Sequence, residues 1–181
     1  HLGASHITGV ELNPVTVSLL REHFVDYNSR IVEQDHVTLV NAEGRAFLSQ
    51  DQEKYDLIWF VAPDSYAAMN AATSGAFVLS ESYLYTKEMI RESLEHLTPY
   101  GIVCAQFGDP QIETRPKRTA RYLTTAREAF RDLGIDNFAK HVLVASTPGF
   151  AFSSASILLR RTPYSDRDAA EFVKHAKGYK K

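Results

Sequence analysis

The hexapeptide GVELNP, residues 9–14, decides how this sequence folds. Its apolar start is typical of a strand, and Asn13 followed by Pro14 is typical of the N-cap and first residue of a helix. Glu11 therefore stands at the end of a strand and directly before a helix. In nucleotide-binding α/β folds, an acid at the end of the second strand accepts hydrogen bonds from ribose hydroxyls. We predict that Glu11 binds a ribose.

Such an acid normally follows a glycine-rich, cofactor-binding turn by about twenty residues. This sequence reaches Glu11 too soon for that turn to precede it. The opening HLGA, residues 1–4, is typical of the last turn of a helix, with Gly3 as its stop signal. We therefore expect an amino-terminally truncated fragment, in which the first strand and the glycine loop are missing.

Length and composition favour one domain. The chain has 181 residues, of which 44% are apolar, enough for one core of ordinary size. We expect a single domain over residues 1–181 that ends in a basic tail over residues 162–181. The net charge of -2 lacks the basic surplus of a nucleic-acid binder, so nucleic acid is not an expected partner.

Other classes of function lack their sequence signatures. Cys104 is the only cysteine, so no internal disulfide can form, and its apolar surroundings predict a small buried side chain on a strand. The histidines show no metal-ligand spacing, and no metal site is expected. No apolar run approaches the ~18 residues of a membrane span. The expected location is the cytoplasm, either for the whole protein or for the cytoplasmic domain of a membrane protein.

Short β-rich runs alternate with longer helical patterns, which is typical of a parallel sheet covered by helices. The last two strands are joined by TPGFAF, residues 147–152, which is too short for a helix and makes them antiparallel. This α/β pattern, a mostly parallel sheet with an antiparallel carboxy-terminal hairpin, predicts the Rossmann-like methyltransferase fold. The predicted strands cover residues 6–11, 36–41, 55–62, 101–107, 138–146 and 153–161, and the predicted helices cover 14–25, 45–50, 83–97 and 117–133.

Three of these helices carry apolar residues at three- and four-residue spacing, which predicts one buried face on each. The predicted core residues are Val17, Leu20 and Phe24 in the first, Ile90, Leu94 and Leu97 in the third, and Tyr122, Ala126, Ala129 and Phe130 in the fourth.

A second acid follows the strand that ends near Asn41. In NAEGRAFL, Glu43 stands at the carboxyl edge where ligands of open α/β sheets bind, and Gly44 lets the backbone turn closely past a ligand. Glu43 either binds the exocyclic amine of a base or is a favourable charge at a helix start.

The next strand end, VAPDSY, places Asp64 and Tyr66 at the same edge. Asp64 either orients an amine substrate or caps the following turn. The long irregular stretch that follows, residues 67–82, is predicted to close over the cofactor as a lid. Farther along, Arg118 or Arg121 in RPKRTAR either holds an anionic substrate group or belongs to a solvated helix start.

Taken in order, GVELNP, NAEGRAFL, YDLIWFVAPDSY, YLYTKE and LTPYGIVCAQFG resemble the spermidine synthase family and its relatives among class I methyltransferases, over roughly residues 3 to 135. The resemblance implies S-adenosylmethionine, or its decarboxylated form, bound with Glu11 at the ribose and Glu43 near the adenine amine. It implies methyl or aminopropyl transfer to a small-molecule amine or other nucleophile. It leaves open whether the protein forms a homodimer.

The sequence departs from the family at one important position. In spermidine synthases an aspartate that takes the proton from the attacking amine occupies the position of Val61, and valine cannot accept a proton. Asp64 matches the family's second aspartate and is the candidate catalytic residue, while Tyr66 and Gln106 are candidate substrate-binding residues. The stretch after Asp64 also resembles bacterial proteins in which a spermidine-synthase-like domain follows membrane spans. The alternative function is therefore a non-catalytic, nucleoside-binding sensor domain of a membrane protein.

Overall fold

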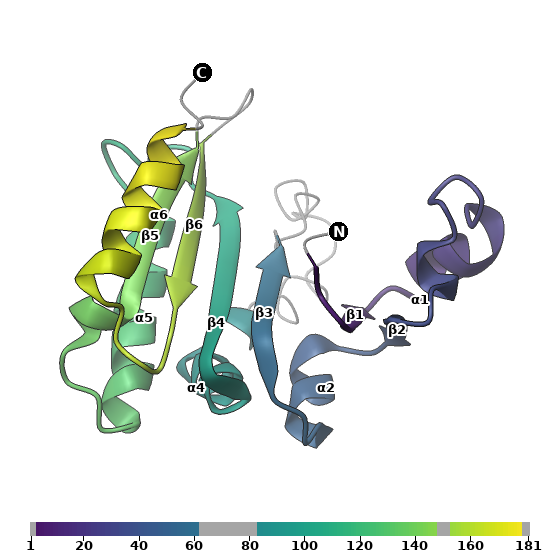
Figure 1. Cartoon of the computed structure of the whole chain (residues 1–181), viewed down its shortest axis with the longest axis horizontal. Helices are drawn as coiled ribbons and strands as arrows, with labels where there is room; N and C mark the ends of the chain where they lie inside the picture. The colour runs from purple at the N-terminus through teal and green to yellow at the C-terminus, as the bar shows by residue number, and fades with distance from the viewer. Residues whose placement is uncertain (1–2, 62–82, 148–152, 179–181) are drawn as a thin grey trace, which may run out of the picture. The chain divides into compact units, whose positions relative to one another are not determined.

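The computed structural model describes residues 3–61, 83–147 and 153–178 of the chain (Figure 1). These residues form two compact units, His1–Asp51 and Gln52–Lys181. Asp64, Tyr66 and the predicted lid lie outside the described residues.

The first unit is a pair of parallel strands with short helices. Strands β1 and β2 pair in register from Ile7 opposite Val37 to Glu11 opposite Asn41, so both strands end at the same edge. The helix α1 begins as the sequence predicts, with Asn13 as N-cap and Pro14 in its first turn. The elements are β1 (Ile7–Glu11), α1 (Pro14–Ser18), the π-helix η1 (Leu19–His23), the 3-10 helix η2 (Ile31–Glu33), β2 (Val37–Asn41) and α2 (Gly44–Gln50).

One predicted core residue of this unit is exposed. Val17 is buried, as predicted, but Phe24 is 52% exposed. The cause is the change from α-helix to π-helix after Ser18, which alters the number of residues per turn and rotates later side chains away from the predicted stripe. Phe24 instead packs edge-on against Tyr27, with ring centroids 6.3 Å apart.

The second unit is built on a four-stranded sheet with strand order β3-β4-β6-β5. Strands β3 and β4 are parallel, whereas β6 is antiparallel to both β4 and β5, which confirms the predicted carboxy-terminal hairpin. The elements are β3 (Tyr55–Val61), the 3-10 helix η4 (Tyr83–Tyr85), α4 (Lys87–Glu95), β4 (Leu97–Gly108), α5 (Lys117–Asp132), the 3-10 helix η5 (Phe138–His141), β5 (Val142–Thr147), β6 (Ser154–Leu159) and α6 (Asp166–Gly178).

Strand β3 forms one edge of this sheet, and β1 belongs to the other, two-stranded sheet. Among the described residues, no strand pairs with the outer edge of β3. Leu57, Trp59 and Val61 alternate along β3 and so lie on one face of it. They are exposed there, Leu57 and Trp59 at 52% each and Val61 at 57%.

Strand β4 is longer than predicted because pairing with β3 begins before Gly101. Leu97 pairs with Tyr55, and the register then shifts so that Ile102 pairs with Leu57. A β-carbon on Gly101 would lie 2.5 Å from the backbone oxygen of Tyr55, so this close approach requires glycine. The predicted helix end at Leu97 is therefore wrong, because α4 ends at Glu95 and Leu97 already belongs to the strand.

The hydrophobic core of the second unit lies between the sheet and helices α4 and α5. Alternate residues of β4 and β6 point into it, as expected for strands with one face against helices. The predicted core residues of both helices are confirmed. The fully enclosed residues include Ile90 and Leu94 of α4, Ala126, Ala129 and Phe130 of α5, Val103 of β4, and Ile157 and Leu159 of β6.

The segment predicted as a tail contains α6, a helix of 13 residues that lies against β5 (Figure 1). The helix is anchored by Arg160, whose side chain is 11% exposed and lies 2.9 Å from the carboxylate of Asp168. The same carboxylate accepts a hydrogen bond from the backbone N–H of Ser165 at 2.9 Å. Arg160, which precedes α6 in the sequence, thus holds in place a polar segment that the sequence predicts to be a tail.

This anchor predicts an acid-sensitive part of the stability. Hydrogen bonds, first from the backbone of Ser165 and then from Arg160, hold the pKa of Asp168 below its ordinary value. Its stabilising contribution is therefore fully present above a pH of about 4 and is lost as the pH falls through the lowered pKa. We expect Asp168→Asn to lower the unfolding free energy at pH 7 and the difference from wild type to shrink under acid conditions. Urea unfolding between pH 7 and pH 3 tests this, with the neighbouring Asp166→Asn as control.

Candidate functional site

The carboxylate of Glu11 lies where β1 ends and the loop to α1 begins. Its Oε1 accepts a hydrogen bond of 2.7 Å from the backbone N–H of Asn13. Among the described residues, Oε2 accepts none, and the side chain is half-buried. The loop therefore fixes the direction of the carboxylate and leaves one oxygen able to accept hydrogen bonds from a ligand.

The end of β2 braces this loop. Asn41 lies opposite Glu11 in the strand register, and its Nδ2 donates to the backbone oxygens of Glu11 at 2.8 Å and Leu12 at 3.1 Å. The backbone N–H of Ala42 also donates to the Glu11 oxygen. Because the backbone oxygens of Glu11 and Leu12 are held by these hydrogen bonds, the Glu11 side chain starts from a fixed position.

Glu43 caps helix α2. Its Oε1 accepts from the N–H of Arg45 at 3.0 Å and its Oε2 accepts from the N–H of Ala46 at 2.8 Å. This is the helix-start role that the sequence left open as an alternative. A carboxylate has about four lone-pair sites, so these two bonds leave acceptor capacity for a ligand amine. Gly44 is the first residue of α2.

In the second unit, the ends of β3 and β4 bring Val61 next to Gln106. Gln106 also pairs with Ser156 of β6, and paired residues share a face of the sheet. Val61, at the position of the expected proton acceptor, is 57% exposed. Among the described residues, the half-buried Gln106 is thus the polar residue that strand pairing places next to Val61.

A buried acid that the sequence patterns do not identify lies at the same end of β4. Asp109 is 2% exposed, and its Oδ2 accepts from the backbone N–H and the hydroxyl of Thr119 at 3.0 Å and 2.8 Å. It thereby caps the first turn of α5 from outside the helix. The distance of ten residues between acid and helix turn explains why capping patterns, which are local, do not find it.

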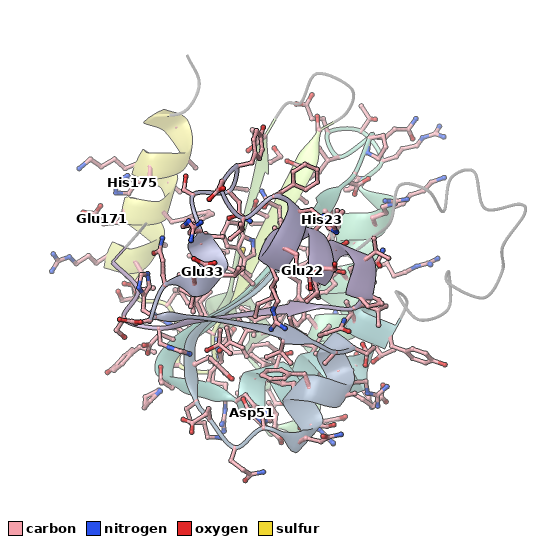
Figure 2. The ribbon with its side chains drawn as sticks, turned by 90° about the vertical axis from the view of Figure 1, so that its right-hand side faces the viewer. Glu22, His23, Glu33, Asp51, Glu171 and His175 are labelled. Atoms are coloured by element: carbon pink, nitrogen blue, oxygen red, sulfur yellow. The ribbon has the colours of Figure 1, made fainter. Side chains whose placement is uncertain are left out.

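The described residues contain no group of three or more histidine, cysteine or acidic side chains that can hold a metal ion. Glu171 and His175 lie on successive turns of α6 (Figure 2), 3.4 Å apart and both largely exposed. Burial raises the pKa of Cys104 to about 11, so this half-buried side chain is a thiol at neutral pH. No helix among the described residues has the length and apolar character needed to span a bilayer.

Comparison with known protein families gives the chain its relatives. The model of the spermine/spermidine synthase domain matches residues 1–133. The chain belongs to this family. Its membership confirms the resemblance predicted from the ordered motifs.

Two curated relatives are named polyamine aminopropyltransferases. Polyamine aminopropyltransferase 1 of Streptomyces coelicolor is 27% identical over 154 residues, which cover 82% of this chain and 27% of that protein. Polyamine aminopropyltransferase 2 of Hyperthermus butylicus is 27% identical over 115 residues, which cover 64% of this chain and 34% of that protein. This spermidine synthase family chain thus spans about a quarter to a third of the length of these relatives.

Solved structures establish the fold. A spermidine synthase in complex with the transition-state analogue AdoDATO matches with a TM-score of 0.65 at 13% identity, covering 93% of this chain and 50% of that one. Human methyltransferase-like protein 13 in complex with SAH matches with a TM-score of 0.61 at 12% identity, covering 96% and 70%. These likenesses confirm the predicted Rossmann-like methyltransferase fold.

Proposed function

We propose that this chain is part of a transferase that uses S-adenosylmethionine or its decarboxylated form. The group moved is a methyl or an aminopropyl group, and the acceptor is a small-molecule amine or another nucleophile. The observation that carries the proposal is the braced carboxylate of Glu11 at the shared end of β1 and β2, in a chain of the spermine/spermidine synthase domain family.

The residues of the first unit fit an adenosyl group. The free oxygen of Glu11 is a charged acceptor suited to ribose hydroxyls, and hydrogen bonds to charged groups are stronger than neutral ones. Glu43 is proposed to accept a hydrogen bond from the adenine amine while it continues to cap α2. When bound, the sulfonium of the cofactor supplies the alkyl group and is already a good leaving group, so the protein contributes mainly by positioning.

The acceptor is proposed to bind at the carboxyl end of β3 and β4, with Gln106 as a hydrogen-bonding group. Asp64 is the proposed catalytic residue and Tyr66 a proposed substrate contact. Both lie outside the described residues and rest on the resemblance of the sequence. Val61 cannot remove a proton from an attacking amine, so we propose that aminopropyl transfer to a diamine is slow in this protein.

A second function is favoured by the same observation about Val61. This domain has the acids needed to bind an adenosyl group and lacks the expected proton acceptor. We therefore propose, as the alternative, a sensor that binds a nucleoside without catalysis. Binding without turnover distinguishes the sensor from the enzyme. The two proposals share the ribose contact of Glu11, so that contact is tested first.

Substituting Glu11 by alanine should weaken S-adenosylmethionine binding by about 1 to 3 kcal/mol, the range for hydrogen bonds to a charged group. Glu11→Gln should give a smaller loss, because the amide oxygen can still accept from Asn13. Titration calorimetry on the whole natural protein measures both. Asp35→Ala, an exposed acid before β2 begins, is the control and should bind as wild type does. Unchanged affinity in Glu11→Ala would remove the ribose assignment.

A further inference from the structure

The second unit contains a pocket between η4, α5 and the end of β4. It has a volume of about 160 Å³ and is lined by Tyr85, Phe107, Arg118, Arg121, Tyr122 and Thr125. All six residues belong to one compact unit, so the pocket is formed without the acids of the other unit.

Three aromatic rings form the apolar wall of this pocket. Tyr85 packs nearly perpendicular to Phe107 and to Tyr122, with centroids 5.9 Å and 6.1 Å apart, and Phe107 lies 5.6 Å from Tyr122. Phe107 and Tyr122 are 3% and 4% exposed. The wall is therefore held by the core and does not need a ligand to form it. A cavity of about 150 Å³ is large enough for a benzene ring.

Two guanidinium groups complete the lining. Arg118 donates from Nη1 to the backbone oxygen of Gly108 at 3.2 Å, which ties it to the end of β4. Among the described residues, no acid forms an ion pair with Arg121. Farther along the same helix, Arg127 and Arg131 both lie beside Glu128, at 3.8 Å and 2.7 Å.

The position of this charge opposes the stability of α5. Residues 115–121 contain four basic side chains and no acidic one, at the start of the helix. A helix N-terminus carries partial positive charge, and a cation in its first turn is unfavourable. The buried carboxylate of Asp109 is bonded to Thr119 in the first turn. Among the described residues, no acid offsets the charge of Arg121, whereas a bound anion would do so.

We propose that this pocket binds a small organic anion, with its carboxylate against Arg121 and its apolar body against the aromatic wall. Guanidinium groups bind carboxylates through paired hydrogen bonds. A diamine would be repelled by the same charge, so the pocket is distinct in chemistry from an amine-acceptor site. The proposal does not rest on the transferase activity and holds equally for a sensor domain.

Benzoate and benzylamine are the probes, since they share a ring and differ in the sign of their charge. Calorimetry on the whole natural protein should detect benzoate binding that weakens with added salt, and no binding of benzylamine. Arg121→Gln should weaken benzoate binding about tenfold or more, the size expected for a lost hydrogen bond to a charged group. Arg127→Gln, at another exposed arginine of α5, is the matched control and should change it less than about twofold.

A third variant, Thr125→Leu, fills the pocket without changing its charge and should also abolish binding. Three results would overturn the proposal. These are no benzoate binding at millimolar concentration, benzylamine binding as tight as that of benzoate, or equal effects of Arg121→Gln and Arg127→Gln.

Discussion

Replacing Val61 by aspartate is expected to raise aminopropyl transfer by about 10²-fold or more, because a positioned general base contributes roughly 10²–10⁴-fold to such reactions. The side chain at this position is 57% exposed, so a carboxylate can be introduced there without burial in the core. Strand pairing places it beside Gln106 at the end of the sheet. Spermidine formation from putrescine and decarboxylated S-adenosylmethionine by the whole natural protein is the assay.

Two variants separate proton transfer from a general effect of polarity at this edge. In Val61→Asn the side chain has nearly the shape of aspartate but cannot accept a proton at neutral pH. The rate of this variant should therefore equal that of the wild type. Leu57→Asp places a carboxylate on the same face of β3, four residues before the strand end, and should not increase the rate either. Wild-type turnover near 1 s⁻¹ or faster, within the ordinary range for enzymes, would show that another group supplies the base.

Replacing Phe130 by alanine should destabilise the second unit by about 3–5 kcal/mol, the cost of removing a large side chain from a packed core. Phe130 is fully buried, and its ring packs against Phe138 at 5.2 Å and His141 at 5.4 Å. Both neighbours come from η5, so the substitution leaves a cavity between α5 and this segment. Urea unfolding measured by circular dichroism gives the free energy.

Tyr100→Ala is the control for this substitution, because Tyr100 is an aromatic residue of β4 that is 75% exposed. Its loss should cost less than about 1 kcal/mol. Equal destabilisation by the two substitutions would mean that the core does not lie between the sheet and α5.

Local sequence patterns predicted the parts of the fold that depend on neighbouring residues. Asn13 and Pro14 start α1 as expected, and the helical spacing of Ala126 and Phe130 places them in the core as predicted. The short connection after β5 makes the final hairpin antiparallel. Each of these features follows from a cap, a period or a loop length, and these can be recognised in a short stretch of sequence.

Features that depend on distant contacts were not predictable in this way. The helix α6 is anchored by Arg160, and the polar sequence around Asp168 gives no sign of that partner. The predicted strand over residues 138–146 begins with the 3-10 helix η5, packed against Phe130.

The pocket also depends on contacts between distant residues, because its lining comes from three elements that meet only in the folded unit. In the sequence, Arg118 and Arg121 stand out for their charge, and the spacing of Tyr122 predicts only a core residue. The aromatic wall, which makes the arginines part of a pocket, exists only where η4, β4 and α5 pack together.

Product analysis by mass spectrometry tests the transferase proposal most directly. The whole natural protein is incubated with S-adenosylmethionine or its decarboxylated form and a panel of amines, and Glu11→Ala is treated in parallel. The account predicts an acceptor that has gained one methyl or one aminopropyl group, with less product from Glu11→Ala. The contradicting result is binding without reaction: calorimetry shows that the protein binds a donor, but neither donor gives a modified acceptor. That result would exclude the transferase proposal and favour the sensor proposal.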